Sequence, residues 1–460
     1  MRDPDIGLPA RRFRLALSFL PFADVASPDL PLGRLLRLSL FQVSVGMAMV
    51  LLLGTLNRVM IVELKVPTTL VAIMVALPIL FAPFRALIGF HSDRHRSELG
   101  WRRVPYIWRG TMAQFGGFAI MPFALLVLAG AGQAAHAPIW VGYVAAGAAF
   151  LLVGAGLHTV QTAGLALATD LTAEHSKPRM VGLMYVTLLL GMAISAVAFG
   201  YLLTDYSHGR LIQVIQGAAV TTLVLNTVAL WKQEPRNRAR AMQSLDQEAS
   251  FFDSMKRLAP TTPQRLWLLT IFTGTLAFTM EDVLLEPYGG EVLGLSVSAT
   301  TYLTATLALG SLLGFWWASE RLGRQACPYR LTQLGAWVGV PSFVVVMLAA
   351  PLQSHLLFSV AVFGIGLGAG LFGHGTLTAT ILSAPNGQSG LALGLWGALQ
   401  ATAAGLGMAS GGILKDLAGH VLSPGPSYAV VYALELVLLG LTLMLLRTTP
   451  INTQGQSRGH

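Results

Sequence analysis

The residues of this chain most capable of chemistry are polar and charged side chains that stand inside long apolar runs. One group lies in segment 54–67 and a second in segment 278–292. Groups of this kind are costly to bury in a membrane, so they mark functional sites by default. Charges at a membrane surface are the plainer interpretation for the pair nearest the expected helix ends, Glu63 and Glu286. The full set is Asn57, Arg58, Glu63, Glu281, Asp282 and Glu286.

Two histidines form a third group, because each closely follows the sequence Gly-Ala-Gly-Leu in an uncharged segment. They are His158 and His374. A histidine nitrogen can ligate a metal, including the central ion of a tetrapyrrole, and nearby glycines would let a flat ring approach the backbone. A histidine hydrogen-bonded to a neighbouring helix is the alternative. Both residues are therefore candidate pigment-binding positions.

The composition indicates a polytopic membrane protein. Hydrophobic residues make up 54% of the 460 residues and charged residues only 11%, about half the charge of an ordinary soluble domain. The single cysteine, Cys327, allows no intramolecular disulfide and no CxxC site. Since the chain also lacks the phosphate-loop, HExxH and nucleophile-elbow motifs, we expect no enzyme, no catalytic residues, no nucleotide and no metal site.

We predict an all-α membrane protein with twelve transmembrane helices in a 6+6 pseudo-twofold bundle. A spanning helix needs about 20 apolar residues, so the length allows about a dozen. Segment 331–414 contains no Asp, Glu, Lys or Arg, as membrane burial requires. The predicted segments are a cytoplasmic amphipathic segment at 1–34, a six-helix half at 35–231, a cytoplasmic linker at 232–264, a second six-helix half at 265–447 and a cytoplasmic tail at 448–460.

The distribution of basic residues predicts the orientation. Of the 30 Lys and Arg residues, all but four fall in segments that share one side of the predicted topology. Basic loops face the cytoplasm, so both termini are expected there, and the basic, amphipathic N-terminal segment is expected to contact membrane lipids. The four exceptions are Arg58, Lys65, Arg210 and Lys415.

Three short matches between the halves support the repeat. The halves place the helices that carry Arg58 and Glu281 in equivalent positions. We therefore expect Arg58 to pair with Glu281 or Asp282 near the outer face, because arginine suits carboxylates. The matches are Pro105-Tyr106 with Pro328-Tyr329, Gly154–Leu157 with Gly368–Leu371, and Gly200–Asp205 with Gly411–Asp416.

Two loops resemble loops of the major facilitator superfamily. The stretch from Gly89 to Arg109 resembles the loop between the second and third helices, with Gly89, Asp93, Arg94, Arg102 and Arg103 at the motif positions. The stretch after the fourth helix resembles the next such loop, with Asp170, Glu174, Arg179 and Gly182. We expect its acids to pair with the arginines of the first loop. The second half has only a degenerate version, and ordinary solvated loop charges are the alternative.

The segments GTLNRVMIVELKVP (54–67), APFRALIGFHSDRHRSELGWRRVPYIWRG (82–110) and LLEPYGG (284–290) resemble one branch of that superfamily closely. This branch is the PucC-type family of bacteriochlorophyll-delivery and light-harvesting assembly factors of phototrophic bacteria. The resemblance implies a photosynthetic-membrane protein that binds bacteriochlorophyll as cargo and presents it to antenna polypeptides beside the pigment synthase. The longer spacing between Asp93-Arg94 and Arg102-Arg103 departs from the superfamily pattern and weakens a gating role for this loop.

Two other functions stay open at this point. A secondary transporter of an amphipathic small molecule would use Arg58 and the acids near Glu281 to handle protons or substrate. A pigment-free scaffold would hold antenna subunits without binding cargo. Pigment that copurifies with the protein favours delivery, uptake of solute into vesicles favours transport, and binding of antenna polypeptides alone favours the scaffold.

Overall fold

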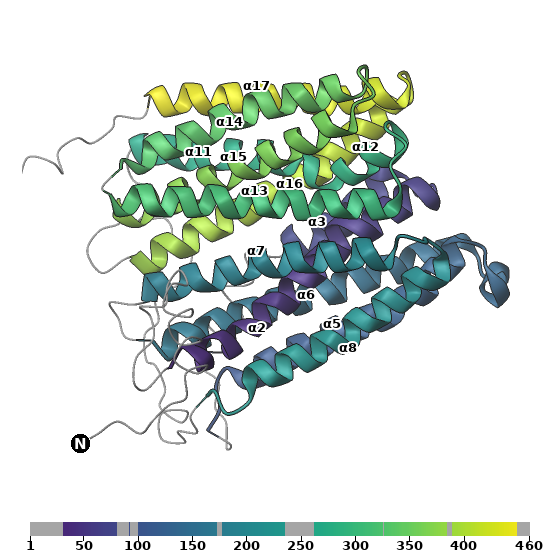
Figure 1. Cartoon of the computed structure of the whole chain (residues 1–460), viewed down its shortest axis with the longest axis horizontal. Coiled ribbons are helices and arrows are strands. Elements are labelled where there is room, and N and C mark those ends of the chain that lie inside the picture. Colours follow the sequence, from purple (N-terminus) through teal and green to yellow (C-terminus); the bar gives the residue numbers. More distant parts are fainter. Residues whose placement is uncertain are drawn as a thin grey trace, which may run out of the picture.

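The computed structural model describes residues 31–80, 92, 100–172, 177–234, 262–324, 326–383 and 389–448. The predicted N-terminal segment up to residue 30, most of the first motif loop, most of the linker and the tail beyond residue 448 lie outside these ranges. Every regular element within the ranges is a helix (Figure 1).

The first set of elements contains five long helices and the shorter helix α3. It comprises α2 (Leu32–Met49), η2 (Val50–Leu56), η3 (Val59–Glu63), α3 (Thr68–Leu80), α5 (Val104–Leu128), η5 (Gly132–His136), α6 (Ile139–Asp170), α7 (Lys177–Leu202) and α8 (His208–Leu230). The second set comprises α11 (Thr262–Thr279), η7 (Glu281–Val283), α12 (Leu285–Glu291), α13 (Val297–Gly323), α14 (Pro328–Ala349), α15 (His355–Leu382), α16 (Ser389–Gly419) and α17 (Pro424–Thr448).

The protein is a multi-pass membrane protein. Within the described residues, ten helices are long and apolar enough to cross a membrane. The helix α3 is apolar but shorter and is not one of these ten. Helices satisfy their backbone hydrogen bonds internally, as the hydrocarbon interior requires. The helix α2 begins and α17 ends at the same side of the molecule (Figure 1). We call this side the arginine-rich end, because Arg34, Arg102 and Arg103 lie there.

Two large cores correspond to the two sets of helices. The first core is built almost wholly from α2 to α8 and contains Phe41, Phe118 and Phe150. The second is built from α11 to α17 and contains Phe343 and Phe358. The sets meet mainly where α7 packs against α13 and where α3 packs against α16 (Figure 1).

The repeated Gly-Ala-Gly-Leu segments pack alike in the two sets. A Cβ atom at Gly156 of α6 would lie 2.5 Å from the carbonyl oxygen of Gly110 on α5. One at Gly368 of α15 would lie 2.8 Å from the carbonyl oxygen of Gly335 on α14. Glycine is therefore required at both crossings, because a side chain would push the two backbones apart.

The other glycines of the two repeats also contact neighbouring helices. Gly154 of the earlier repeat lies against Pro78, and Gly370 of the later repeat lies against the backbone of Ser311. A Cβ atom at Gly373, beside His374, would instead meet nothing within 4 Å. The approach of a flat ring to the backbone beside a histidine therefore stays a prediction.

Two spanning segments are irregular. After Met49 the first helix widens into the π-type segments η2 and η3, with Asn57 and Arg58 between them. The segment that begins as α11 is interrupted by the 3₁₀ turn η7 before it continues as α12. Such irregular backbone in a membrane needs partners from neighbouring helices, and π-type turns are frequent at functional sites.

Candidate functional site

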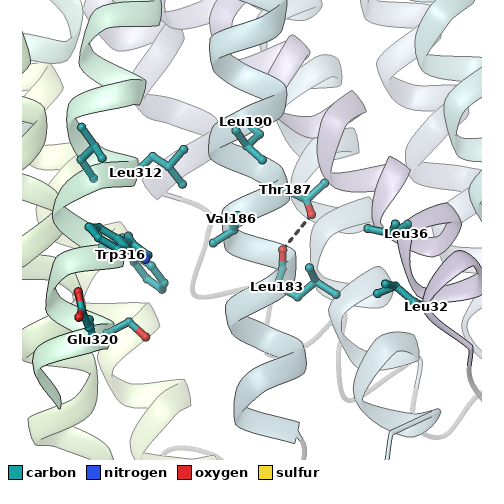
Figure 2. A pocket seen from close by; sticks show the side chains of 12 residues that line it. Leu32, Leu36, Leu183, Val186, Thr187, Leu190, Leu312, Trp316 and Glu320 are labelled. Carbon is teal, nitrogen blue, oxygen red and sulfur yellow. Dashed lines mark hydrogen bonds between the residues drawn. The ribbon is translucent and has the colours of Figure 1, made fainter. Parts of the chain in front are cut away.

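One candidate site is a cavity between α7 and α13 (Figure 2). Its volume is about 580 Å³, within the range of small-molecule sites. Two leucines of α2 close one side, as Figure 2 shows with α7 between α2 and α13. The lining residues are Leu32, Leu36, Leu183, Val186, Thr187, Leu190, Leu312, Leu313, Phe315, Trp316, Ser319 and Glu320.

The chemistry of this cavity is apolar with a polar margin. Nine of its twelve lining side chains are aliphatic or aromatic. The Thr187 hydroxyl is occupied, because it donates a hydrogen bond to the Leu183 carbonyl oxygen at 2.9 Å. Trp316 is 54% exposed and offers a large aromatic face. The cavity therefore suits a bulky apolar molecule and has few groups that could replace the hydration of a polar solute.

One of the two candidate histidines contacts a residue that lines this cavity. The ring of His374 is 4.2 Å from the ring of Phe315, centroid to centroid, and Phe315 lines the cavity. His374 is half-buried, and its Nδ1 atom is buried with no hydrogen-bond partner in the described part of the protein. An imidazole held in this way keeps a nitrogen available for ligation once Phe315 moves.

His158 lies elsewhere, at a much smaller cavity among η2, α3 and α6. That cavity has a volume of about 40 Å³, and Gly154, Pro78 and Phe150 line it together with His158. This space holds no more than about one water-sized group. The two histidines thus differ in the volume of the cavity near each. His158 lines a cavity of about 40 Å³, whereas His374 contacts Phe315, which lines the cavity of about 580 Å³.

The expected pairing of Arg58 with Glu281 or Asp282 is wrong. The Arg58 guanidinium instead forms an ion pair with Glu63 and donates from Nη2 to the Leu295 carbonyl oxygen at 3.0 Å. The pairing with Glu63 follows from the local helix geometry, because a π-type turn brings residues five apart onto one face. Arg58 still connects the two sets of helices, but it does so through a backbone carbonyl.

Among the remaining residues of this group, Asn57 also bridges the two sets. Asn57 donates from Nδ2 to the carbonyl oxygens of Leu53 at 3.0 Å and of Val283, in η7, at 2.7 Å. Glu286 accepts a hydrogen bond from the Thr304 hydroxyl. Glu281 is 1% exposed, and its Oε2 atom has no partner in the described residues. Asp282 is half-buried.

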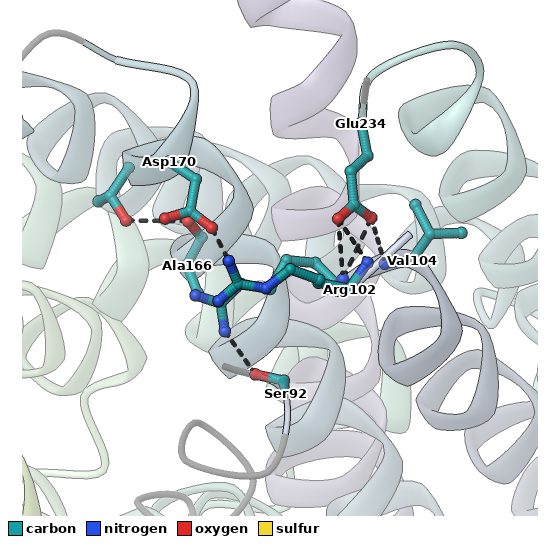
Figure 3. A network of polar contacts seen from close by, with 8 residues as sticks. Ser92, Arg102, Val104, Ala166, Asp170 and Glu234 are labelled. Carbon is teal, nitrogen blue, oxygen red and sulfur yellow. Dashed lines mark hydrogen bonds and ion pairs between the residues drawn. The ribbon is translucent and has the colours of Figure 1, made fainter. Parts of the chain in front are cut away.

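At the arginine-rich end, the expected pairing between the two motif loops is present for one pair (Figure 3). Arg103 donates from Nε to Asp170 at 3.0 Å and from Nη1 to the Ser92 hydroxyl at 2.6 Å. Glu234, which sequence analysis does not single out, accepts from the backbone amides of Arg102 and Val104 at 2.7 and 2.9 Å. An acid at the first amides of α5 satisfies unpaired donors and complements the helix dipole.

Most of the other motif residues lie outside the part of the chain that the structure describes. Gly89, Asp93, Arg94 and Glu174 lie outside the described residues, as does the Arg179 side chain. Gly182 lies within α7. In the second set, Glu320 pairs with Arg324 along one helix at 2.6 Å.

The structure also buries polar residues that are not among the candidates identified from the sequence. Glu435 of α17 is 0% exposed, and both its carboxylate oxygens lack a partner in the described residues. It is a lone acid in an apolar helix, and that signal is visible in the sequence. At the end opposite the arginines, Lys415 donates to the Thr68 hydroxyl at 3.0 Å and pairs with Glu291 at 3.5 Å.

Comparison with known proteins places this architecture among named families. A family model described as PUCC protein matches residues 55–454. The chain is 60% identical to Protein PucC of Rhodovulum sulfidophilum, over 86% of this chain and 88% of the relative. It is 54% identical to Protein PucC of Cereibacter sphaeroides, over 94% and 95%. It is 26% identical to a Rhodobacter capsulatus protein named bacteriochlorophyll synthase 44.5 kDa chain, over 92% and 97%.

Solved structures of transporters share the fold. A bacterial homologue of the human lysosomal transporter Spinster superposes with a TM-score of 0.60 at 15% identity, covering 90% of this chain and 94% of that one. A bacterial homologue of the iron transporter ferroportin gives 0.64 at 14% identity, covering 90% and 97%. At such identities the likeness concerns the fold alone, which is that of major-facilitator-type transporters.

Proposed function

The chain belongs to the PUCC protein family, and from this membership we propose that it binds bacteriochlorophyll and delivers it to light-harvesting antenna polypeptides during assembly. The observation that carries the proposal is the cavity between α7 and α13. Its aliphatic and aromatic lining fits a pigment that is mostly apolar, and burial of apolar surface contributes about 25 cal/mol per Å².

His374 supplies the polar contact in this proposal. The magnesium ion of a bacteriochlorin takes an axial donor, and a neutral imidazole is such a donor. Phe315 covers the His374 ring and lines the cavity, so displacement of Phe315 by the cargo would bring the two together. His158 then has a structural role, since its cavity is too small for the ring.

The rest of the proposal concerns organisation. The two sets of helices act as six-helix halves of a pseudo-twofold bundle, which the matched glycine crossings support. The arginine-rich end faces the cytoplasm of a photosynthetic bacterial membrane, following the bias of basic residues. The protein works without catalysis beside the pigment synthase, whose product it would receive; the name of the distant relative, bacteriochlorophyll synthase 44.5 kDa chain, supports this context.

A transporter of an amphipathic molecule is the second candidate function, because the solved structures with this fold are transporters. The buried acids near η7 favour it, since they could carry protons or contact a substrate. Solute uptake by vesicles that contain the purified protein, with no pigment bound, would support transport over delivery. A pigment-free scaffold predicts neither pigment nor uptake.

The proposal is tested by purifying the full chain from a pigmented host and recording its absorption spectrum. Val186→Trp fills the cavity, and Val197→Trp places the same residue at an exposed position of the same helix outside it. We expect pigment in the wild type and in Val197→Trp, and about tenfold less in Val186→Trp, which corresponds to ~1.4 kcal/mol of binding. Equal pigment content in the two variants would show that the pigment binds outside this cavity.

A second comparison tests the ligand. His374→Leu should shift the pigment absorption or lower the pigment content, whereas His158→Leu should change neither. The thermal unfolding midpoint of each variant reports whether the fold is retained. Pigment that is insensitive to His374→Leu in a folded protein would show that the magnesium ligand is another group.

A further inference from the structure

The interior of the second set of helices holds acidic side chains without a basic partner among the described residues. Glu435 of α17 is 0% exposed, and both of its carboxylate oxygens lack a hydrogen bond. Glu281 of η7 is 1% exposed, and its Oε2 atom lacks one. A third polar group, the Tyr432 hydroxyl, is also fully buried with no partner. These groups are separate from the cavity between α7 and α13.

The same groups lie close together in space. Tyr432 and Glu435 are three residues apart on α17 and so share one helical face. The Tyr432 ring is 5.5 Å from the ring of Tyr288 on α12, centroid to centroid. Glu281 lies two residues beyond the end of α11, and α11 packs directly against α17. Two different elements, η7 and α17, therefore direct unpaired polar groups into one interior region.

The charged groups on the neighbouring elements do not neutralise this region. The helix α17 packs against α11, α12, α14 and α16. Arginines lie in the opening turns of α11 and α14, and the lysine of α16 pairs with Glu291. No ion pair within the described residues reaches Glu281 or Glu435. The titratable and charged groups on these elements and on η7 are Arg265, Glu281, Asp282, Glu286, Tyr288, Glu291, Tyr329, Arg330, Lys415, Asp416 and, on α17 itself, Tyr428, Tyr432, Glu435 and Arg447.

We propose that Glu435 and Glu281, together with the Tyr432 hydroxyl, form a proton-binding site. A carboxylate that is buried without a hydrogen bond or counter-ion is strongly unfavourable. A bound proton removes that charge and turns one acceptor into a donor toward the neighbouring oxygens. A proton fits better than a metal ion, because the described residues contain no group of three or more histidine, cysteine or acidic side chains placed to hold one.

The position of the site gives the proton a structural consequence. Glu281 belongs to the turn that interrupts the segment from α11 to α12, and Glu435 belongs to α17. Loss of the proton would leave like charges on both elements, and their repulsion would favour separation of η7 from α17. Proton binding at this site therefore holds the interrupted helix against α17.

The test uses infrared spectra of the purified full chain, in which a protonated carboxyl gives a C=O band distinct from that of a carboxylate. At neutral pH we expect this band in the wild type, its loss or reduction in Glu435→Gln and Glu281→Gln, and no change in Asp205→Asn, a control at an exposed position outside the cavity. Because glutamine mimics the neutral acid, Glu435→Gln should also keep the wild-type unfolding midpoint, and Glu435→Ala reports the cost of a cavity.

Three outcomes would overturn the proposal. The first is a wild-type spectrum without a protonated-carboxyl band at neutral pH. The second is a band that neither glutamine substitution changes. The third is a rise in the unfolding midpoint on addition of sodium or potassium chloride that Glu435→Gln abolishes, because this would assign the site to a cation.

Discussion

Asn57 donates a hydrogen bond from Nδ2 to the carbonyl oxygen of Val283 at 2.7 Å, at the point where the segment from α11 to α12 is interrupted. A 3₁₀ turn in a membrane frees backbone carbonyls that water cannot reach, so they need a donor from another helix. Asn57 supplies it from between two π-type segments of the first helix. A side chain at the irregular part of the first helix thus satisfies a backbone carbonyl that the interruption between α11 and α12 leaves free.

The first prediction follows from this bond. Asn57→Ala leaves the Val283 carbonyl buried without its donor and should cost ~1–3 kcal/mol of unfolding free energy. Thr227→Ala on α8 is the control, because this exposed hydroxyl bonds only to its own helix, and it should stay within about 0.5 kcal/mol. Thermal unfolding of the purified protein measures both. Equal midpoints for the two variants would remove the Asn57 bond from the account of stability.

The second prediction concerns the two contacts of Arg58. Glu63→Gln removes the ion pair but keeps the donation to the Leu295 carbonyl, whereas Arg58→Ala removes both. The Glu63 side chain is 34% exposed, so we expect Glu63→Gln to cost less than Arg58→Ala. Gly290→Ala should also destabilise, since its Cβ would lie 3.1 Å from Arg58 Nε. A greater loss of stability for Glu63→Gln than for Arg58→Ala would contradict this ranking of the contacts.

Neighbouring glycines on α5 provide a third prediction with a built-in control. A Cβ at Gly117 would lie 2.8 Å from the Ala149 carbonyl oxygen on α6, whereas one at Gly116 meets nothing within 4 Å. Gly117→Ala should therefore cost ~1–3 kcal/mol through overpacking. Gly116→Ala should be neutral or stabilising by up to ~1 kcal/mol through helix propensity. The order of the two unfolding midpoints decides the matter, and a reversed order would refute this packing of α5 on α6.

The fourth prediction concerns the carboxylate at the start of α5. Glu234→Ala removes the acceptor for the amides of Arg102, Arg103 and Val104, whose bonds are 2.7, 3.1 and 2.9 Å long. These amides should then exchange hydrogen for deuterium faster than in the wild type. Glu234→Gln keeps an acceptor oxygen and should give an intermediate rate. Unchanged exchange in Glu234→Ala would mean that other groups satisfy these amides.

The sequence is enough to predict an all-helical membrane protein, because the apolar runs are long, although ten and not twelve helices of the described residues are long and apolar enough to cross a membrane. It is also enough to find Asn57 and Arg58, because polar groups stand out in such runs. It does not reveal their partners. The Val283 and Leu295 carbonyls become available only where the helix is interrupted or ends, and Arg58 meets Glu63 only because the intervening turn is of the π type. Charge matching between distant helices therefore predicts the wrong pair.

The candidate cavity and the missed acid illustrate two different limits. The cavity arises from the way α7 and α13 cross, and its leucines and valine resemble every other lipid-facing residue in the sequence. Glu435 is different, because a single acid in an apolar helix is a visible signal. The packing of α11 and α12 against α17, which places Glu281 and Glu435 in the same part of the fold, is not visible in the sequence.

The delivery of pigment is the central claim, and transfer measured in solution tests it most directly. The wild-type protein, loaded with bacteriochlorophyll, is mixed in detergent with pigment-free antenna polypeptides, and the absorption spectrum is followed with time. The account predicts that the pigment band of the protein declines as the antenna band appears, faster than with the same amount of free pigment, and that Val186→Trp protein exposed to the same pigment loses this advantage. Antenna formation at the same rate with and without the protein would contradict it.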